Sequence, residues 1–160
     1  MSTLYVDNLQ PNLGSRVMAA GHVVQVVSHQ SSTARTTTST TYVDTGEVVS
    51  ITPTAASSKV LIVVSGFLSS SLSNYYSWVQ LCRGSTVLVP DIVQVDHTSF
   101  SRSGENWGCN YLDSPSSTSQ VDYKLQIKSE NAAATAKLSI GANNGTDVQP
   151  LNITLMEIAQ

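Results

Sequence analysis

The sequence predicts an all-β protein, an antiparallel β-sandwich or jelly roll of about eight strands that follows an extended N-terminal arm. Three observations predict this class. Val, Ile and Thr make 42 of the 160 residues, and their β-branched side chains suit a pleated sheet better than a helix. Apolar residues recur with a period of two, and no useful length of sequence has the period of an amphipathic helix. Strand-like segments follow one another at regular spacing, which is typical of a sandwich.

The first 21 residues are predicted to form the arm, and residues 22–160 the sandwich domain. Pro11, Gly14 and Gly21 interrupt the first segment, and its apolar residues keep no steady period. Such a segment buries too little apolar surface to fold alone. A frayed terminus is the alternative. The number of apolar side chains favours an arm that docks on another protein through Leu4, Tyr5, Val6, Leu9, Leu13 and Val17.

The first strands are expected between His22 and Thr52. His22–Ser28 is rich in Val and predicts a strand. Ser31–Thr41 has one apolar residue, Ala34, and is either a flexible loop or an exposed edge, because Thr fits strands well. We expect a short strand at Tyr42–Asp44, a turn at Thr45-Gly46 and a strand at Val48–Thr52 that Pro53 stops.

The middle of the chain contains the strongest strand and hairpin signals. Lys59–Ser65 is a continuous aliphatic run with a charge at its start and Gly66 at its end, which predicts a strand buried on both faces. Tyr75–Arg83 and Thr86–Pro90 flank Gly84-Ser85 and predict a hairpin. A further strand is expected at Ile92–Thr98.

The last third of the chain predicts a loop and three strands. Ser99–Gly108 is rich in Ser and Gly and is expected to be a loop. Val121–Lys128 alternates apolar odd-numbered with polar even-numbered residues, so one of its faces is buried. Ala136–Ala142 and Leu151–Ile158 complete the set, with a turn at Asn143–Gly145 between them.

The final strand carries apolar side chains on both faces. Leu151, Ile153 and Leu155 point one way, while Met156 and Ile158 point the other. A strand of this kind lies either at the centre of a sheet or at a subunit interface. We predict a homo-oligomer whose interface includes Ile153, Leu155, Met156 and Ile158.

Charge and hydropathy exclude several classes of partner. Charged residues make 12% of the chain, against about 25% in an average domain, whereas Ser and Thr make 41 of its residues. The net charge is −3 and the eight Lys and Arg residues form no cluster, which argues against nucleic-acid binding. The longest aliphatic run, Val60–Val64, is too short to cross a membrane, so no membrane insertion is expected. The first residues lack the basic and apolar regions of a secretory signal, and none is expected.

No catalytic motif is found, and we predict a protein that is not an enzyme and needs no cofactor. The sequence has no nucleophile elbow, no H-E-x-x-H, no C-x-x-C and no phosphate-binding glycine loop. Asp91, Asp96 and His97 are candidate metal ligands, but their acidic spacing is sparse for Ca²⁺ and a solvated strand end is favoured. Cys82 and Cys109 either form a single disulfide or remain reduced thiols, and the expected absence of an export signal favours the reduced thiols.

The two tryptophans are interpreted differently. Trp78 lies in a predicted strand and is expected in the core. Trp107 lies in the predicted Ser/Gly loop, with Tyr111 close behind, and either packs in the core or presents a flat apolar ring to a sugar. Trp107 and Tyr111 are therefore candidate glycan contacts.

Blocks of sequence in a fixed order carry a resemblance that covers nearly the whole chain. They are Ser2–Gln10, Gly21–Val27, Val49–Pro53 with Ser57–Ile62, Leu81–Thr86, Leu112–Pro115 with Tyr123–Ile127, and Ile153–Gln160. Through them the chain resembles small tail-fibre-like and virion-appendage proteins of marine and freshwater tailed bacteriophages, cyanophages especially. The resemblance implies a trimeric jelly-roll knob on a virus particle, tied to the virion by the N-terminal arm. Fibres of this kind often carry a long shaft between tag and knob, which this chain lacks.

We therefore predict a non-enzymatic virion structural protein, a homotrimeric tail-fibre-like appendage for host attachment. The expected partners are its own copies, another virion protein bound through the arm, and a glycan of the host cell surface. Two alternatives remain: a capsid decoration protein that stabilises the head, because no shaft is present, and a carbohydrate-binding module.

Overall fold

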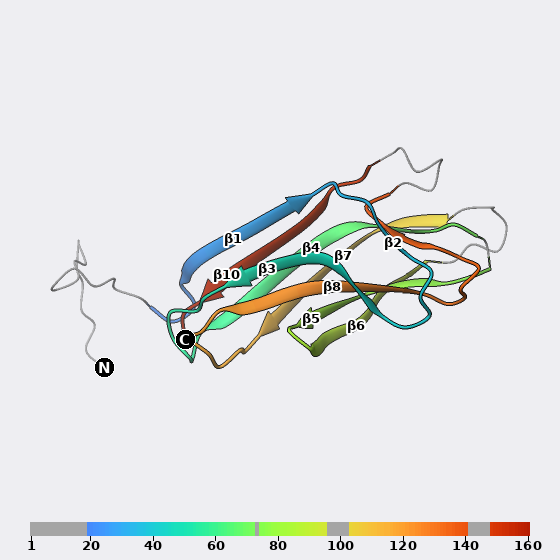
Figure 1. The fold of residues 1–160 in the computed structure, drawn as a ribbon. Coiled ribbons are helices and arrows are strands. Elements are labelled where there is room, and N and C mark those ends of the chain that lie inside the picture. Colours follow the sequence, from blue (N-terminus) through green and yellow to red (C-terminus); the bar gives the residue numbers. More distant parts are fainter. Residues whose placement is uncertain (1–18, 73, 96–102, 141–147) are drawn as a thin grey trace, which may run out of the picture.

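Two antiparallel β-sheets packed face to face form the protein, as Figure 1 shows. The computed structural model describes residues 19–72, 74–95, 103–140 and 148–160, and within these ranges it contains strands and no helix. The predicted all-β sandwich is confirmed.

Sheet A contains six strands, but it is only four strands wide, because each of two short strands extends the path of a longer one. β10 pairs with the first half of β4 and β9 with its second half, so β9 continues the line of β10. In the same way β2 continues the line of β1, while β7 pairs along the other edge of β4. The strands of sheet A are β1 (Val23–Ser31), β2 (Arg35–Thr37), β4 (Lys59–Ser70), β7 (Ser103–Asp113), β9 (Ala136–Leu138) and β10 (Leu151–Ile158).

Sheet B contains four strands in the order β3-β8-β5-β6. They are β3 (Val43–Ile51), β5 (Ser77–Arg83), β6 (Thr86–Val95) and β8 (Val121–Ser129). The hairpin predicted at Gly84-Ser85 is confirmed, because β5 ends and β6 begins on either side of it. With the long strands ordered β1-β10-β4-β7 and β3-β8-β5-β6, the chain crosses repeatedly between the sheets, as in a jelly roll.

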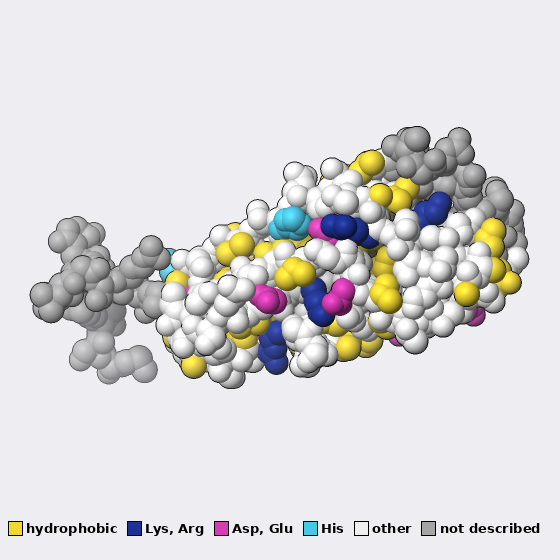
Figure 2. All heavy atoms as spheres, in the orientation of Figure 1, with side chains coloured by type: hydrophobic (Ala, Val, Ile, Leu, Met, Phe, Trp, Pro, Cys, Tyr) yellow, Lys and Arg dark blue, Asp and Glu magenta, His cyan; other side chains and the backbone are white. Residues whose placement is uncertain are grey.

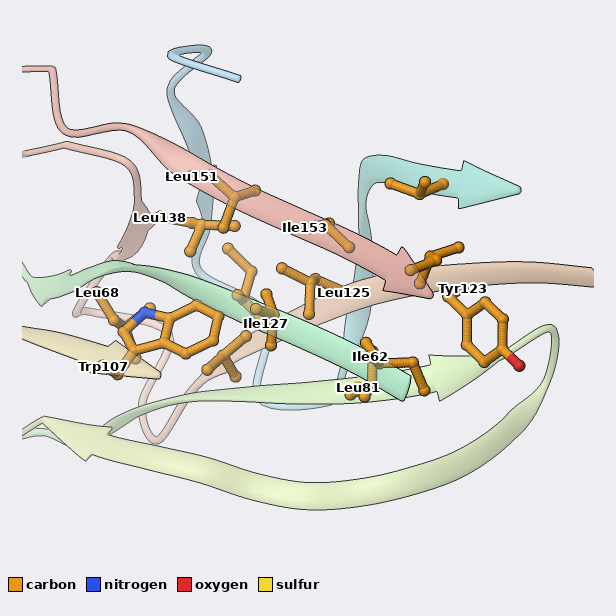
Figure 3. Close-up of a cluster of buried hydrophobic side chains, with 14 of the residues drawn as sticks. Ile62, Leu68, Leu81, Trp107, Tyr123, Leu125, Ile127, Leu138, Leu151 and Ile153 are labelled. Carbon is orange, nitrogen blue, oxygen red and sulfur yellow. The ribbon is translucent and has the colours of Figure 1, made fainter. Parts of the chain in front are cut away.

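The core lies between the sheets and follows the period-two pattern of the long strands. In β8 the odd-numbered side chains from Val121 to Ile127 are buried, which confirms the alternation seen in the sequence. Even-numbered residues of β4 and odd-numbered residues of β10 meet them from sheet A. Figure 3 shows these side chains interleaved, with Ile62 and Ile153 facing Leu125 and Ile127.

Two predicted breaks in sheet B are bulges inside continuous strands. The expected turn at Thr45-Gly46 lies within β3, where the register shifts between Asp44 and Val48 and Gly46 adopts a φ of +80° that favours glycine. Thr86–Pro90 and Ile92–Thr98 were expected as separate strands, but β6 runs through Pro90 to Val95 with irregular pairing. Residues 96–98 lie outside the described residues.

Two predictions about sheet A are wrong. Gly66 does not end its strand, because β4 continues to Ser70. A Cβ on Gly66 would lie 2.9 Å from Leu151 and 3.1 Å from the Trp107 ring, so close packing rather than a turn requires glycine there. Residues 103–108 were expected in a loop, yet they begin β7, which pairs with β4 along eleven positions. The partner strand overrides the weak strand propensity of this Ser/Gly-rich sequence.

The segment between Ser31 and Thr41 combines edge strand and connection. β1 reaches Ser31, and Arg35–Thr37 forms the short edge strand β2. Residues 1–18, which contain all six predicted anchoring side chains of the arm, lie outside the described residues. The last residues of the predicted arm are fixed to the end of the chain, because Gly21 N donates to Ala159 O at 2.7 Å.

Candidate functional site

Among the described residues, three buried carboxylates hold the sandwich together, and the first is Glu47 of β3. Its Oε2 lies 2.9 Å from His29 Nε2, and its Oε1 accepts from Arg35 Nε at 3.0 Å and Ser31 Oγ at 3.1 Å. Burial alone would raise the pKa of Glu47, but the hydrogen bonds from His29, Arg35 and Ser31 together lower it. This cluster joins β1 and β2 of sheet A to β3 of sheet B.

Glu157 is the second buried carboxylate and lies at the end of β10. Its oxygens accept from Gln25 Nε2 at 2.6 Å and from the Thr54 backbone N and Oγ1 at 2.8 and 2.7 Å. Burial opposes ionisation, yet the donors, Ser58 among them, lower the pKa of Glu157. The carboxylate therefore fixes the loop after β3 to sheet A.

Asp113 of β7 is the third and pairs with two groups from sheet B. Arg83 Nη1 donates to both of its oxygens at 2.8 Å, and Tyr123 Oη donates to Oδ2 at 2.7 Å. Burial and the Asp113 carboxylate raise the pKa of Tyr123, so its phenol remains a donor. In all three clusters the carboxylate accepts hydrogen bonds that link strands or fix a loop to a sheet. We therefore interpret the three carboxylates as structural.

The metal candidates do not come together among the described residues. Asp91 is exposed, has a φ of +44° and accepts a hydrogen bond from Tyr42 Oη, while Asp96 and His97 lie outside the described residues. No group of three or more His, Cys, Asp and Glu side chains suited to a metal ion occurs in the described ranges. Cys82 and Cys109 are free thiols, and burial raises the pKa of both, which lowers their reactivity.

The interpretation of Trp107 as a glycan contact is wrong. Trp107 is 8% exposed and packs in the core beside Leu68, as Figure 3 shows. Its indole N–H is buried and has no hydrogen-bond partner in the described part of the chain, so its burial keeps this donor from contact with a ligand. Tyr111, on the same inward face of β7, is half-buried against the same core.

The four predicted interface residues of β10 separate by face. Ile153 and Leu155 are 1% and 0% exposed in the single chain, because they pack against sheet B. They leave no surface for a second subunit, and their assignment to an interface is corrected to the core. Met156 and Ile158 are half-buried on the outer face of sheet A, where the interface prediction still applies. β10 occupies a central position in sheet A, between β1 and β4.

The outer face of sheet B carries three partly exposed aromatic rings, Tyr42, Tyr76 and Trp78. Together with the polar residues that contact them, Lys128, Asp91 and Gln94, they are here called the aromatic patch. Lys128 Nζ lies 4.6 Å from the ring centroids of both Tyr42 and Trp78. Trp78 Nε1 donates to Gln94 Oε1 at 3.2 Å, and Tyr76 stacks obliquely on Trp78 with centroids 5.6 Å apart. Trp78 was expected in the core but projects outward, because its neighbours Ser77 and Val79 take the inward positions of β5.

Partial burial and the Asp91 hydrogen bond raise the pKa of Tyr42, so this phenol also remains a donor. Lys128 Nζ lies 3.9 Å from Asp91 Oδ1. The patch thus combines flat apolar rings with fixed donors and acceptors and little net charge. Sequence reasoning missed the patch, although the closeness of Tyr75, Tyr76 and Trp78 in the sequence is a signal that could have indicated it.

The outer face of sheet A is different, because it lacks such polar clusters. Val26 of β1 pairs with Met156 of β10, Met156 with Leu61 of β4, and Leu61 with Leu112 of β7. These four side chains, here called the apolar row, cross the sheet in one line. Sequence reasoning identified one of the four, Met156, because the register that aligns them joins strands distant in the chain.

Figure 2, which views the molecule from one side, shows how sparse charged side chains are on a largely uncharged polar surface.

No helix among the described residues has the length and apolar character needed to cross a membrane. Neither a protein-family model nor a curated protein sequence matches the chain.

Proposed function

We propose that the protein is a non-enzymatic structural protein of a bacteriophage virion, a homotrimeric appendage on the particle surface that contacts the host. The observation that carries the proposal is the jelly-roll sandwich in which the buried carboxylates of the described residues are all engaged in holding strands together. In such a protein the outer surfaces, rather than a reactive pocket, perform the function. The ordered resemblance to virion-appendage proteins supplies the biological setting, with residues 1–21 as the virion-docking arm.

Deletion of residues 1–20 tests the docking role of the arm. We expect a soluble protein with the same subunit number as the full chain that no longer joins particles, because the sandwich contacts described above begin at Gly21. The measurement is the amount of protein in purified particles, with the full-length chain as the control. Normal incorporation of the truncated protein would contradict the anchoring role. Quantification against the major capsid protein separates a fibre, with a low copy number, from a capsid decoration protein, with a high one.

Carbohydrate binding is the second candidate function, and the aromatic patch favours it. Trp78 and Tyr42 offer apolar rings on which a sugar stacks, while Asp91 and Gln94 supply hydrogen-bonding groups beside them. Lys128 Nζ lies over both rings, 4.6 Å from each centroid, and so places a positive charge beside the apolar surface. This patch takes the place of Trp107 as the candidate glycan contact.

We expect Trp78→Ala to weaken binding to host-envelope glycans about tenfold or more, which corresponds to a loss of about 1.4 kcal/mol. Glycan-array binding followed by titration of the glycans that bind is the measurement. Val48→Ala is the matched control, since Val48 is an exposed side chain on the outer face of the same sheet outside the patch. Equal binding by wild type and Trp78→Ala, or no binding by either, would contradict the carbohydrate role.

A further inference from the structure

The apolar row is the most exposed hydrophobic feature of sheet A. Val26 and Leu112, at its two ends, are 56% and 50% exposed, and Met156 and Leu61 between them are partly exposed. Val23, 43% exposed, pairs with Ile158 and extends the apolar surface along β1 and β10. Val63 and Phe67 add further partly exposed apolar side chains along β4. Contiguous apolar surface of this kind marks an interaction site.

The same face is nearly free of charge. The strand register and the alternation of side chains show which residues of the long strands point outward. These residues are Val23, Val26, Ser28 and Gln30 in β1; Asn152, Thr154, Met156 and Ile158 in β10; Lys59, Leu61, Val63, Ser65 and Phe67 in β4; and Asn106, Gly108, Asn110 and Leu112 in β7. Among these described positions Lys59 is the single charged residue, and it lies at one end of β4. In the short strand β9, Lys137 pairs with Ser69 and adds a second positive charge at the other end of β4.

The outer face of sheet B has the opposite character. Lys124 Nζ donates to Asp44 Oδ2 at 2.8 Å, and Asp122 accepts from Ser50 Oγ at 2.7 Å. Together with Lys128 these residues give that face a mixed charge pattern suited to water. The two outer faces therefore differ in charge although both belong to the same sandwich.

We propose that the outer face of sheet A is the surface through which copies of this chain pack against one another. The proposal deepens the homo-oligomeric appendage proposed above and rests on it for the expectation that the chain associates at all. The small number of charged side chains on this face is the argument that a second copy of the chain, rather than another protein, binds there. Close to a symmetry axis, copies of the same side chain approach one another, so a charge near the axis would lie against its own like charge. A face on which the outward positions of the four long strands carry Lys59 as their single charged residue, at one end of β4, meets its own copy with little of this repulsion.

Charged substitutions at the two ends of the apolar row test the proposal. We expect the full-length wild-type chain to have a mass in solution that is a multiple of 17.0 kDa, and the double variant Val26→Asp/Leu112→Asp to have the monomer mass. Both positions are at least half exposed, so the charges are compatible with the folded chain. Light scattering after size-exclusion chromatography measures the mass, and thermal unfolding monitored by circular dichroism verifies the fold.

Val48→Asp/Val87→Asp is the matched control. Val48 and Val87 are 44% and 46% exposed in strands of sheet B, and the pair adds the same two negative charges. The control is expected to keep the wild-type mass. If Val26→Asp/Leu112→Asp keeps that mass as well, the proposal is overturned.

A chain that lacks residues 1–18 tests the alternative that the N-terminal segment mediates association. If this truncation alone produces monomers and the Val26→Asp/Leu112→Asp variant does not, the sheet A face is not the contact. A monomeric wild type would contradict both this proposal and the trimeric appendage. Continued assembly of the face variant, with normal incorporation into particles, would contradict the face and leave the appendage proposal intact.

Discussion

Replacement of Leu155 by alanine should lower the free energy of unfolding by about 2–5 kcal/mol, the range found for buried Leu-to-Ala changes. Leu155 is fully buried, and its neighbours in register on the two flanking strands are Val27 of β1 and Ile62 of β4. The substitution removes apolar contacts on the inner side of sheet A and leaves a cavity against sheet B. Urea unfolding of the wild type and the variant measures the difference.

The adjacent Met156→Ala variant is the control for this prediction. Met156 is half-buried on the other face of the same strand, so its truncation should cost clearly less folding free energy in the single chain. Equal losses for the two variants would contradict the assignment of Leu155 to the core and Met156 to the outer face. Urea titration at low protein concentration keeps any subunit association from contributing to the comparison.

Arg83→Met should destabilise the fold by about 1–3 kcal/mol, the cost of leaving a buried acceptor without its donor, because the Arg83 side chain is itself 29% exposed. Asp113 is 5% exposed and receives both of its ionic hydrogen bonds from Arg83 Nη1. Methionine approximates the aliphatic stem of arginine but offers no donor, so Asp113 keeps the hydrogen bond from the Tyr123 hydroxyl and loses its counter-charge. Chemical unfolding at neutral pH measures the loss.

The double variant Arg83→Met/Asp113→Asn separates the charge from the packing. Asparagine removes the buried charge and still accepts a hydrogen bond from Tyr123, so we expect the double variant to regain much of the stability lost in Arg83→Met. A double variant no more stable than Arg83→Met would show that the loss arises from packing around the arginine stem rather than from the uncompensated carboxylate.

Much of the fold could be predicted because strand alternation is a local property. Val121–Lys128 showed its buried face directly, and Gly84-Ser85 marked the β5–β6 hairpin. The errors have local causes as well. Glycine at positions 46 and 66 resembled a break, although one accommodates a bulge with positive φ and the other a close approach of Leu151 and Trp107. Ser and Gly in residues 103–108 concealed a strand that its partner β4 stabilises.

The candidate sites were predicted less well, because exposure depends on what covers a side chain. Trp78 and Trp107 both lie in strands, and the sequence suggested that Trp78 was the buried one. The second sheet covers the inward face of β7, which buries Trp107, whereas Trp78 occupies an outward position of β5 beside Lys128. The apolar row was also missed as a unit, since it is assembled from four strands far apart in the chain.

The sequence by itself determined the all-β class, the positions of most strands and which residues of each strand share a face. Each follows from the period of two and from turn residues, which act between near neighbours. The tertiary structure decided which face of each strand is covered, and so placed Leu155 in the core and Met156 outside. It also brought Glu47, Asp113 and Glu157 to their partners. Strand pairing and sheet packing join distant residues through hydrogen bonds and apolar burial, and no local pattern specifies that choice.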